Sequence, residues 1–204
     1  LGFMVFHPQV YVTDNPEQTL NNLVSNSSAA RIRLLLELII IVSQALAAAW
    51  FYKLFKEINQ WAASVLGLWG TVNAVVLMLS AISMHAAMCI AASAQSIQEK
   101  ISLIQLLSKI IGGSWFIGGL FFGLWLLPMG FIIMISKRMP FWLGCVLIVG
   151  GAGYLLQTVL MSAGIQSSFL NYLVLPATVG ELWIIGYLLI FGIRPAQSNQ
   201  PAAI

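Results

Sequence analysis

Charged residues are scarce in this sequence. Lys, Arg, Asp and Glu together make up 7% of the 204 residues, against roughly 25% in an ordinary soluble domain. So little charge cannot cover a water-facing surface, which excludes a soluble globular protein. The nine Lys and Arg residues stand singly or in pairs, and this spacing argues against a basic surface that would bind nucleic acid.

Catalytic and cofactor motifs are missing as well. The sequence has no P-loop, dinucleotide fingerprint, nucleophile elbow or HExxH stretch, so we predict no catalytic residue. His85 and Cys89 are four residues apart, but no other His or Cys stands near enough to complete a metal-binding set. We therefore expect neither a metal nor a cofactor, with haem ligation by His85 as an open alternative.

Long apolar runs dominate what is present. Hydrophobic residues make up 60% of the chain, and its mean hydropathy is +0.93. A helix needs about 20 predominantly apolar residues to cross a bilayer, and none of the runs has the alternating pattern of a membrane barrel. We predict an all-α, polytopic membrane protein with five complete spans, at residues 32–55, 61–92, 108–135, 141–163 and 170–193.

The segments outside these runs complete the predicted single domain, residues 1–204. Residues 1–8 are too short to span and are interpreted as the stump of a truncated first helix, which makes the parent fold a six-helix bundle. Residues 9–30 form a polar outer loop, in which Asn15-Pro16-Glu17 predicts a helix start. The apolar stripe of residues 96–107 predicts an interfacial helix. Residues 194–204 are predicted to form a disordered cytoplasmic tail.

Loop charges give an orientation. If the five spans alternate, one side of the membrane collects a set of basic residues, and the other side holds charges of mixed sign. The positive-inside rule assigns the basic set to the cytoplasm, which puts the C-terminus there too. The set consists of Lys53, Lys56, Lys137, Arg138 and Arg194.

Two carboxylates lie inside predicted spans, where a charge is costly and commonly marks an ion pair or a functional site. Glu37 stands one helical turn after Arg33, so we expect an ion pair between them. Glu181 falls near the middle of the last span. Counting depth along each helix gives a hypothetical polar ligand pocket around it, and interhelical hydrogen bonding is the alternative for the same residues. The other pocket residues are Asn73, Gln44, His85 and Gln157.

Small residues recur at helical spacing in two places, and we expect both to be helix-packing faces. One is a G-x-x-x-G pair and the other a stripe on the second span. The residues are Gly119 and Gly123, and Ser83, Ala87 and Ala91.

The run GGLFFGLWLLPMGFIIMISKRMPFWLGCVLIVGGAGYL, with LPA and GELW further on, has a distinctive order of glycines, prolines and aromatic residues. It resembles the signature of a bacterial integral-membrane family, domain of unknown function DUF4386. The FYKLFKEIN turn and the Arg31 and Glu37 positions are similar to that family as well. The resemblance implies a six-helix fold in a bacterial inner membrane, and it implies no activity.

Three classes of function remain. We expect an accessory or scaffolding subunit that packs against a larger membrane complex, because the chain is small and lacks a catalytic constellation. The expected partners are the lipid bilayer and either other membrane-protein subunits or a second copy of the chain. A small-molecule transporter or receptor with its pocket around Glu181 is the first alternative. An intramembrane enzyme with Glu181 and His85 as acid and base is the second.

Overall fold

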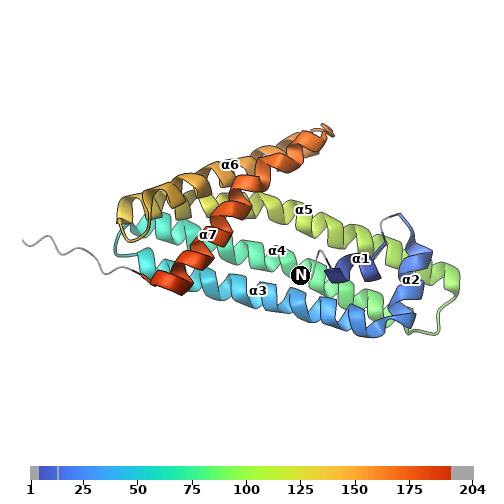
Figure 1. Ribbon diagram of the computed structural model, residues 1–204. Helices are drawn as coiled ribbons and strands as arrows, with labels where there is room; N and C mark the ends of the chain where they lie inside the picture. Colours follow the sequence, from blue (N-terminus) through green and yellow to red (C-terminus); the bar gives the residue numbers. More distant parts are fainter. Residues whose placement is uncertain (1–4, 13, 194–204) are drawn as a thin grey trace, which may run out of the picture. The chain divides into compact units, whose positions relative to one another are not determined.

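Helices form every regular element in the part of the chain that the computed structural model describes, residues 5–12 and 14–193. The stump predicted at residues 1–8 lies half outside this part, and the predicted tail, residues 194–204, lies wholly outside it. The elements follow one another as α1 (His7–Val10), α2 (Pro16–Ser25), α3 (Ser27–Phe55), α4 (Gln60–Ala91), α5 (Ile97–Ser136), α6 (Phe141–Ser162), η2 (Ser168–Val174) and α7 (Leu175–Phe191) (Figure 1).

Within the described residues, five helical segments are long and apolar enough to cross a membrane: α3, α4, α5, α6, and η2 together with α7. They confirm the predicted all-α fold of five spans and show a multi-pass membrane protein. Their outward surface is apolar, as contact with lipid requires. On α3, for example, Leu35, Ile39, Val42 and Leu46 recur at helical spacing and are 57–66% exposed.

The chain forms two compact units. Unit 1 contains the described residues up to Ala47, together with Thr71–Gly118. Unit 2 contains Ala48–Gly70 and the described residues from Gly119 onward. The helices α3, α4 and α5 therefore each contribute one part to unit 1 and another part to unit 2.

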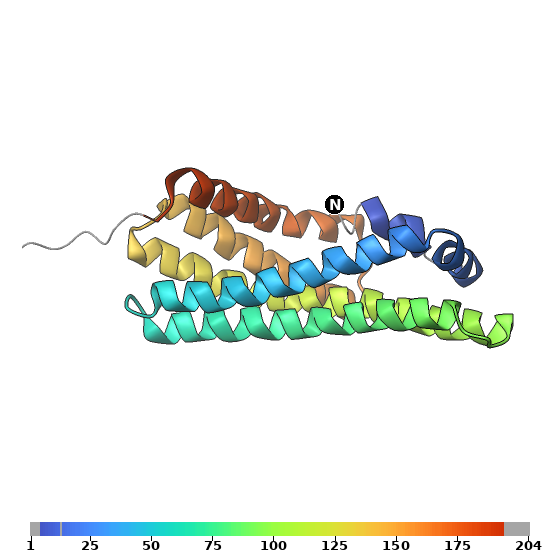
Figure 2. The ribbon, with the colours of Figure 1, turned by 90° about the horizontal axis from the view of Figure 1, so that it is seen from below.

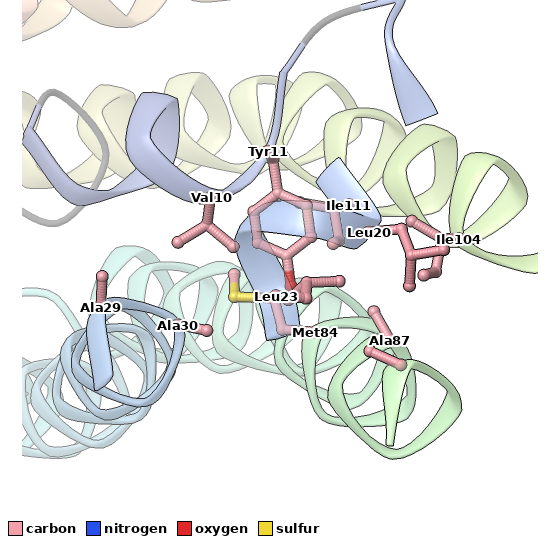
Figure 3. Packing of buried hydrophobic residues seen from close by; sticks show 11 residues of the cluster. Val10, Tyr11, Leu20, Leu23, Ala29, Ala30, Met84, Ala87, Ile104 and Ile111 are labelled. Atoms are coloured by element: carbon pink, nitrogen blue, oxygen red, sulfur yellow. The ribbon is translucent and has the colours of Figure 1, made fainter. Parts of the chain in front are cut away.

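In unit 1 the parts of α3, α4 and α5 are joined by α1 and α2. The Asn15 side chain accepts a hydrogen bond from the Gln18 backbone N–H at 2.9 Å, which confirms the predicted start of α2. A hydrophobic core ties α1 and α2 to the long helices, and Figure 3 shows the Tyr11 ring in the middle of it. The core consists of Val10, Tyr11, Leu20, Leu23, Ala29, Ala30, Met84, Ala87, Ala91, Ile104 and Ile111.

Protein covers part of the stripe that was predicted to lie on the membrane surface at residues 96–107. The stripe is the first part of α5, which continues without a break to Ser136. Ile104 is fully buried, and Ile101 and Leu107 pack against the core of unit 1. Ile97, at the start of the stripe, is 71% exposed. Protein therefore covers the later part of the stripe, and contact of its first part with the membrane surface stays a prediction.

Unit 2 packs its helices closely through glycine. A Cβ atom on Gly123 would lie 2.7 Å from the Gly151 carbonyl oxygen, and one on Gly130 would lie 2.5 Å from that of Gly144. Further along, a Cβ on Gly150 would meet the backbone of Ala177, where α6 and α7 pack side by side (Figure 2). Glycine faces let helix backbones approach closely where lipid offers no hydrophobic driving force.

Candidate ligand pocket in unit 1

A pocket of about 330 Å³ opens between the N-terminal segment and α5 in unit 1. One wall comes from α1, the α1–α2 connection and the start of α2, and the other from one face of α5. Most of the lining residues carry a hydrogen-bonding side chain, although apolar atoms make up the larger part of the pocket surface. The lining residues are His7, Tyr11, Val12, Asp14, Asn15, Pro16 and Thr19 on the first wall and Gln105, Ser108, Lys109 and Gly112 on the second.

Local hydrogen bonds fix the N-terminal wall. Thr19 is 1% exposed, and its hydroxyl oxygen accepts from the Val12 backbone N–H at 3.0 Å and donates to the Asn15 carbonyl at 3.1 Å. The Asn22 amide donates to the Val10 carbonyl at 3.4 Å. Between these ties, Asp14 adopts a positive φ of 60°, a conformation that Asp tolerates better than most residues. This wall is therefore a folded element with a defined shape.

A buried charge cluster belongs to the same unit. Arg33 and Glu37 are both 0% exposed, and the Arg33 Nη1 lies 2.6 Å from the Glu37 Oε2. The other carboxylate oxygen accepts from the Trp115 indole N–H at 3.0 Å. Because α3 supplies the ion pair and α5 supplies the indole, this cluster links two of the helices that build unit 1.

The cluster acts electrostatically on two pocket residues. Burial, assisted by the positive charge of Arg33, lowers the pKa of His7 from 6.5 to about 4. Burial also raises the pKa of the Tyr11 hydroxyl above its usual range. Both side chains are therefore uncharged near neutral pH, and their rings stack with centroids 5.1 Å apart. The permanent charges on the pocket wall are then Asp14 and Lys109.

Asp14 and Lys109 stand on opposite walls. Among the described residues, neither makes an ion pair with the other or with a third group. Ser108, one residue before Lys109, adds a buried hydroxyl oxygen that has no hydrogen-bond partner among the residues that the structure describes. Two opposite charges and a spare hydroxyl thus face one cavity.

The hypothetical pocket residues from the sequence are divided between the two units. Gln44, Asn73 and His85 belong to unit 1. Asn73 is 0% exposed, and both polar atoms of its amide lack a hydrogen-bond partner among the described residues, as does the Gln44 Nε2. His85 is exposed and lies 3.7 Å from the Cys89 sulfur.

Glu181 and Gln157 belong to unit 2. One oxygen of Glu181 is buried without a hydrogen-bond partner in the described chain. The Gln157 amide donates to the Asn171 side chain at 3.5 Å, at an exposed position. A ligand pocket around Glu181 stays a prediction.

The small-residue faces lie inside the units. A Cβ on Gly119 would lie 3.3 Å from the Thr158 hydroxyl oxygen, and Gly123 packs on α6 as described above. Ser83, Ala87 and Ala91 are 5%, 0% and 7% exposed, and the two alanines are part of the unit 1 core.

Sequence reasoning did not find the pocket. In the sequence, Asp14 falls in the predicted outer loop, Lys109 at the start of a predicted span and His7 in the predicted helix stump. Residues 7–19 and 105–112 are far apart in the sequence, and no periodic pattern in either segment indicates that they face each other. The one available signal was the helix start at Asn15, which shows that the outer loop is folded.

The described residues contain no group of three or more His, Cys, Asp or Glu side chains that could hold a metal ion. The expectations on cofactors, haem at His85 included, stay predictions.

Comparison with known proteins gives a family and no activity. No curated protein and no solved structure matches the chain significantly. The family model described as "Domain of unknown function (DUF4386)" matches residues 1–192, nearly the whole chain and both units. The protein therefore belongs to the DUF4386 family, as the resemblance in its sequence predicted.

Proposed function

We propose that this protein is a membrane receptor for a small polar molecule, which it binds in the pocket of unit 1. The observation that carries the proposal is a cavity of about 330 Å³ whose facing walls hold charges of opposite sign, Asp14 and Lys109, which form no ion pair among the described residues. Concave sites with a few convergent polar groups are where proteins bind small molecules. The buried Arg33–Glu37 pair and its Trp115 partner give unit 1 a fixed interior behind these walls.

Helix length supports a position of the pocket in the headgroup region. α5 has 40 residues and is therefore about 60 Å long, twice the roughly 30 Å of a hydrocarbon core. The pocket residues Gln105, Ser108 and Lys109 lie in its first third, beyond what a span requires. With the basic loops in the cytoplasm, this region is extracytoplasmic, and we propose a bacterial inner-membrane protein with a cytoplasmic C-terminus.

Two neighbouring glycines offer a direct test. Gly112 lines the pocket, whereas Gly113 does not, and a Cβ at either position would meet no atom within 4 Å. Gly112→Trp should fill the pocket without a backbone clash, and Gly113→Trp is the matched control on the same helix. The purified full chain would be screened by thermal shift against a library of small polar metabolites.

We expect at least one compound to raise the Tm of the wild type and of Gly113→Trp and to leave Gly112→Trp unchanged. A ligand that stabilises all three proteins equally would show that the pocket is not its site. A library without a stabilising compound would contradict the receptor proposal.

The accessory-subunit hypothesis has lost one of its supports. Small-residue faces could also have served to bind a partner subunit, but Gly123, Ala87 and Ala91 are used for packing within the chain. It stays a prediction, and purification in mild detergent followed by mass determination tests it. A stoichiometric larger complex would favour the subunit, and a lone monomer or homodimer would exclude it.

A further inference from the structure

We propose that the pocket of unit 1 binds a phosphoethanolamine group, an anionic phosphate joined by two carbons to a primary ammonium. This inference rests on the receptor function proposed above and names its ligand class. The group exists as the headgroup of a phospholipid, where the phosphate is a diester, and as a free phosphomonoester. Both sources carry an anionic phosphate and a primary ammonium separated by two carbons.

The charge distribution of the pocket selects a ligand that carries both signs. Asp14 on the N-terminal wall and Lys109 on α5 are its permanent charges, and they make no ion pair with each other in the described chain. A purely anionic ligand would face the Asp14 carboxylate, and a purely cationic one would face the Lys109 ammonium. A dipolar ligand with separated charges complements both walls at once.

Donor groups on α5 favour phosphate at the Lys109 end. Gln105, Ser108 and Lys109 stand at positions i, i+3 and i+4, which places them on one face of the helix. They offer an amide, a hydroxyl and an ammonium. A phosphomonoester has three strong acceptor oxygens to receive them, and the phosphodiester of a lipid headgroup has two non-bridging oxygens, each with more than one lone pair. The Ser108 hydroxyl is buried and has no other hydrogen-bond partner among the described residues.

The Asp14 wall suits a primary ammonium. Its carboxylate can accept hydrogen bonds that a primary ammonium donates. A choline group, with three methyl groups on the nitrogen, cannot make those hydrogen bonds. The pocket should therefore distinguish ethanolamine from choline headgroups.

The lipid source has a structural route to the pocket. Leu106 and Ile110 flank the Lys109 region of α5 and are 55% and 39% exposed. Acyl chains can lie along such exposed apolar side chains while the headgroup enters the polar cavity. A soluble phosphomonoester would not use this apolar surface.

The experiment compares two charge variants with two controls in the full-length protein. Lys109→Gln and Asp14→Asn each remove one pocket charge. Arg31→Gln and Glu17→Gln remove exposed charges of the same signs from residues that do not line the pocket. Each protein would be reconstituted in nanodiscs of phosphatidylethanolamine, phosphatidylcholine or phosphatidylglycerol, retained lipid would be counted by native mass spectrometry, and O-phosphoethanolamine would be titrated by thermal shift.

We expect both pocket variants to bind the ethanolamine probe about tenfold more weakly, since each loses a charged hydrogen-bond partner, and both controls to match the wild type. Selective retention of phosphatidylethanolamine with no response to O-phosphoethanolamine identifies the lipid as the source. A response to O-phosphoethanolamine identifies the free phosphomonoester.

Equal retention of the three lipids without any response to O-phosphoethanolamine would overturn the ligand class. Pocket variants that behave like the two controls would overturn it as well. If another compound is still blocked by Gly112→Trp in the preceding test, the receptor proposal survives and only the phosphoethanolamine inference fails. If Gly112→Trp blocks no compound, both proposals fail together.

Discussion

Removing one member of the buried ion pair should be far more damaging than removing both. In Glu37→Leu, the Arg33 guanidinium stays at a position that is 0% exposed but loses the carboxylate 2.6 Å away. The Trp115 indole N–H also loses its acceptor at 3.0 Å. Breaking a buried pair from one side costs about 3–5 kcal/mol, and we expect a loss of unfolding free energy in that range.

The double variant Arg33→Met/Glu37→Gln tests the cause of that loss. It removes both charges, and the Gln side-chain oxygen can still accept from Trp115. Replacing a buried pair by uncharged groups of similar volume is often neutral or stabilising by about 1–4 kcal/mol. We therefore expect the double variant to be at least as stable as the wild type.

The assay is equilibrium unfolding in mixed micelles with a rising fraction of denaturing detergent, followed by circular dichroism. The chain provides its own control in the pair of Lys56 and Glu57, which are 3.9 Å apart and 45% and 79% exposed. Glu57→Leu should change stability by less than about 1 kcal/mol. If the double variant is as unstable as Glu37→Leu, the loss of the carboxylate beside the buried Arg33 charge is not the cause, and the reasoning fails.

Three further predictions concern pH, packing and buried amides. Burial lowers the pKa of His7 to about 4, so the unfolded chain binds a proton at His7 at a higher pH than the folded chain does. The Tm should therefore fall as the pH decreases from about 6.5 to 4. His7→Asn should flatten this part of the Tm–pH curve. Gly123→Ala should lower the unfolding free energy by about 1–3 kcal/mol, because its Cβ would lie 2.7 Å from the Gly151 carbonyl oxygen. Gly186→Ala has open space around the new Cβ and should raise the unfolding free energy by up to about 1 kcal/mol. Detergent unfolding measures both changes. Asn73→Leu should raise stability by about 1–3 kcal/mol, because it removes two buried polar atoms without partners in the described chain; a loss of stability in the same assay would show that the amide is hydrogen-bonded in the membrane.

Hydropathy was sufficient to predict the spans, because the free energy of transfer into lipid depends on composition along a local run. The start of α2 was predictable for a similar reason, since Asn15 and Pro16 act on their own backbone. The surroundings of the first part of α5 could not be predicted in this way. The spacing of Ile101, Ile104 and Leu107 shows that one helix face is covered, but a periodic pattern does not contain the identity of the covering group.

The pocket was out of reach for a stronger reason. It depends on contact between the N-terminal segment and α5, which chain-local patterns do not encode. Glu181 attracted attention because a lone carboxylate in an apolar run is conspicuous in a sequence. Asp14 and Lys109 look like ordinary loop charges, and only the folded N-terminal segment brings them to a common cavity.

The i,i+4 arrangement of Arg33 and Glu37 has a consequence for the biosynthesis of the protein. Each charge on its own opposes entry of α3 into the bilayer. Because both residues belong to one helix, they can neutralise each other as soon as that helix forms, before α4 has been synthesised. α3 can thus move from the translocon into lipid before the later helices have been made. The indole of Trp115 completes the cluster only after α5 has been synthesised.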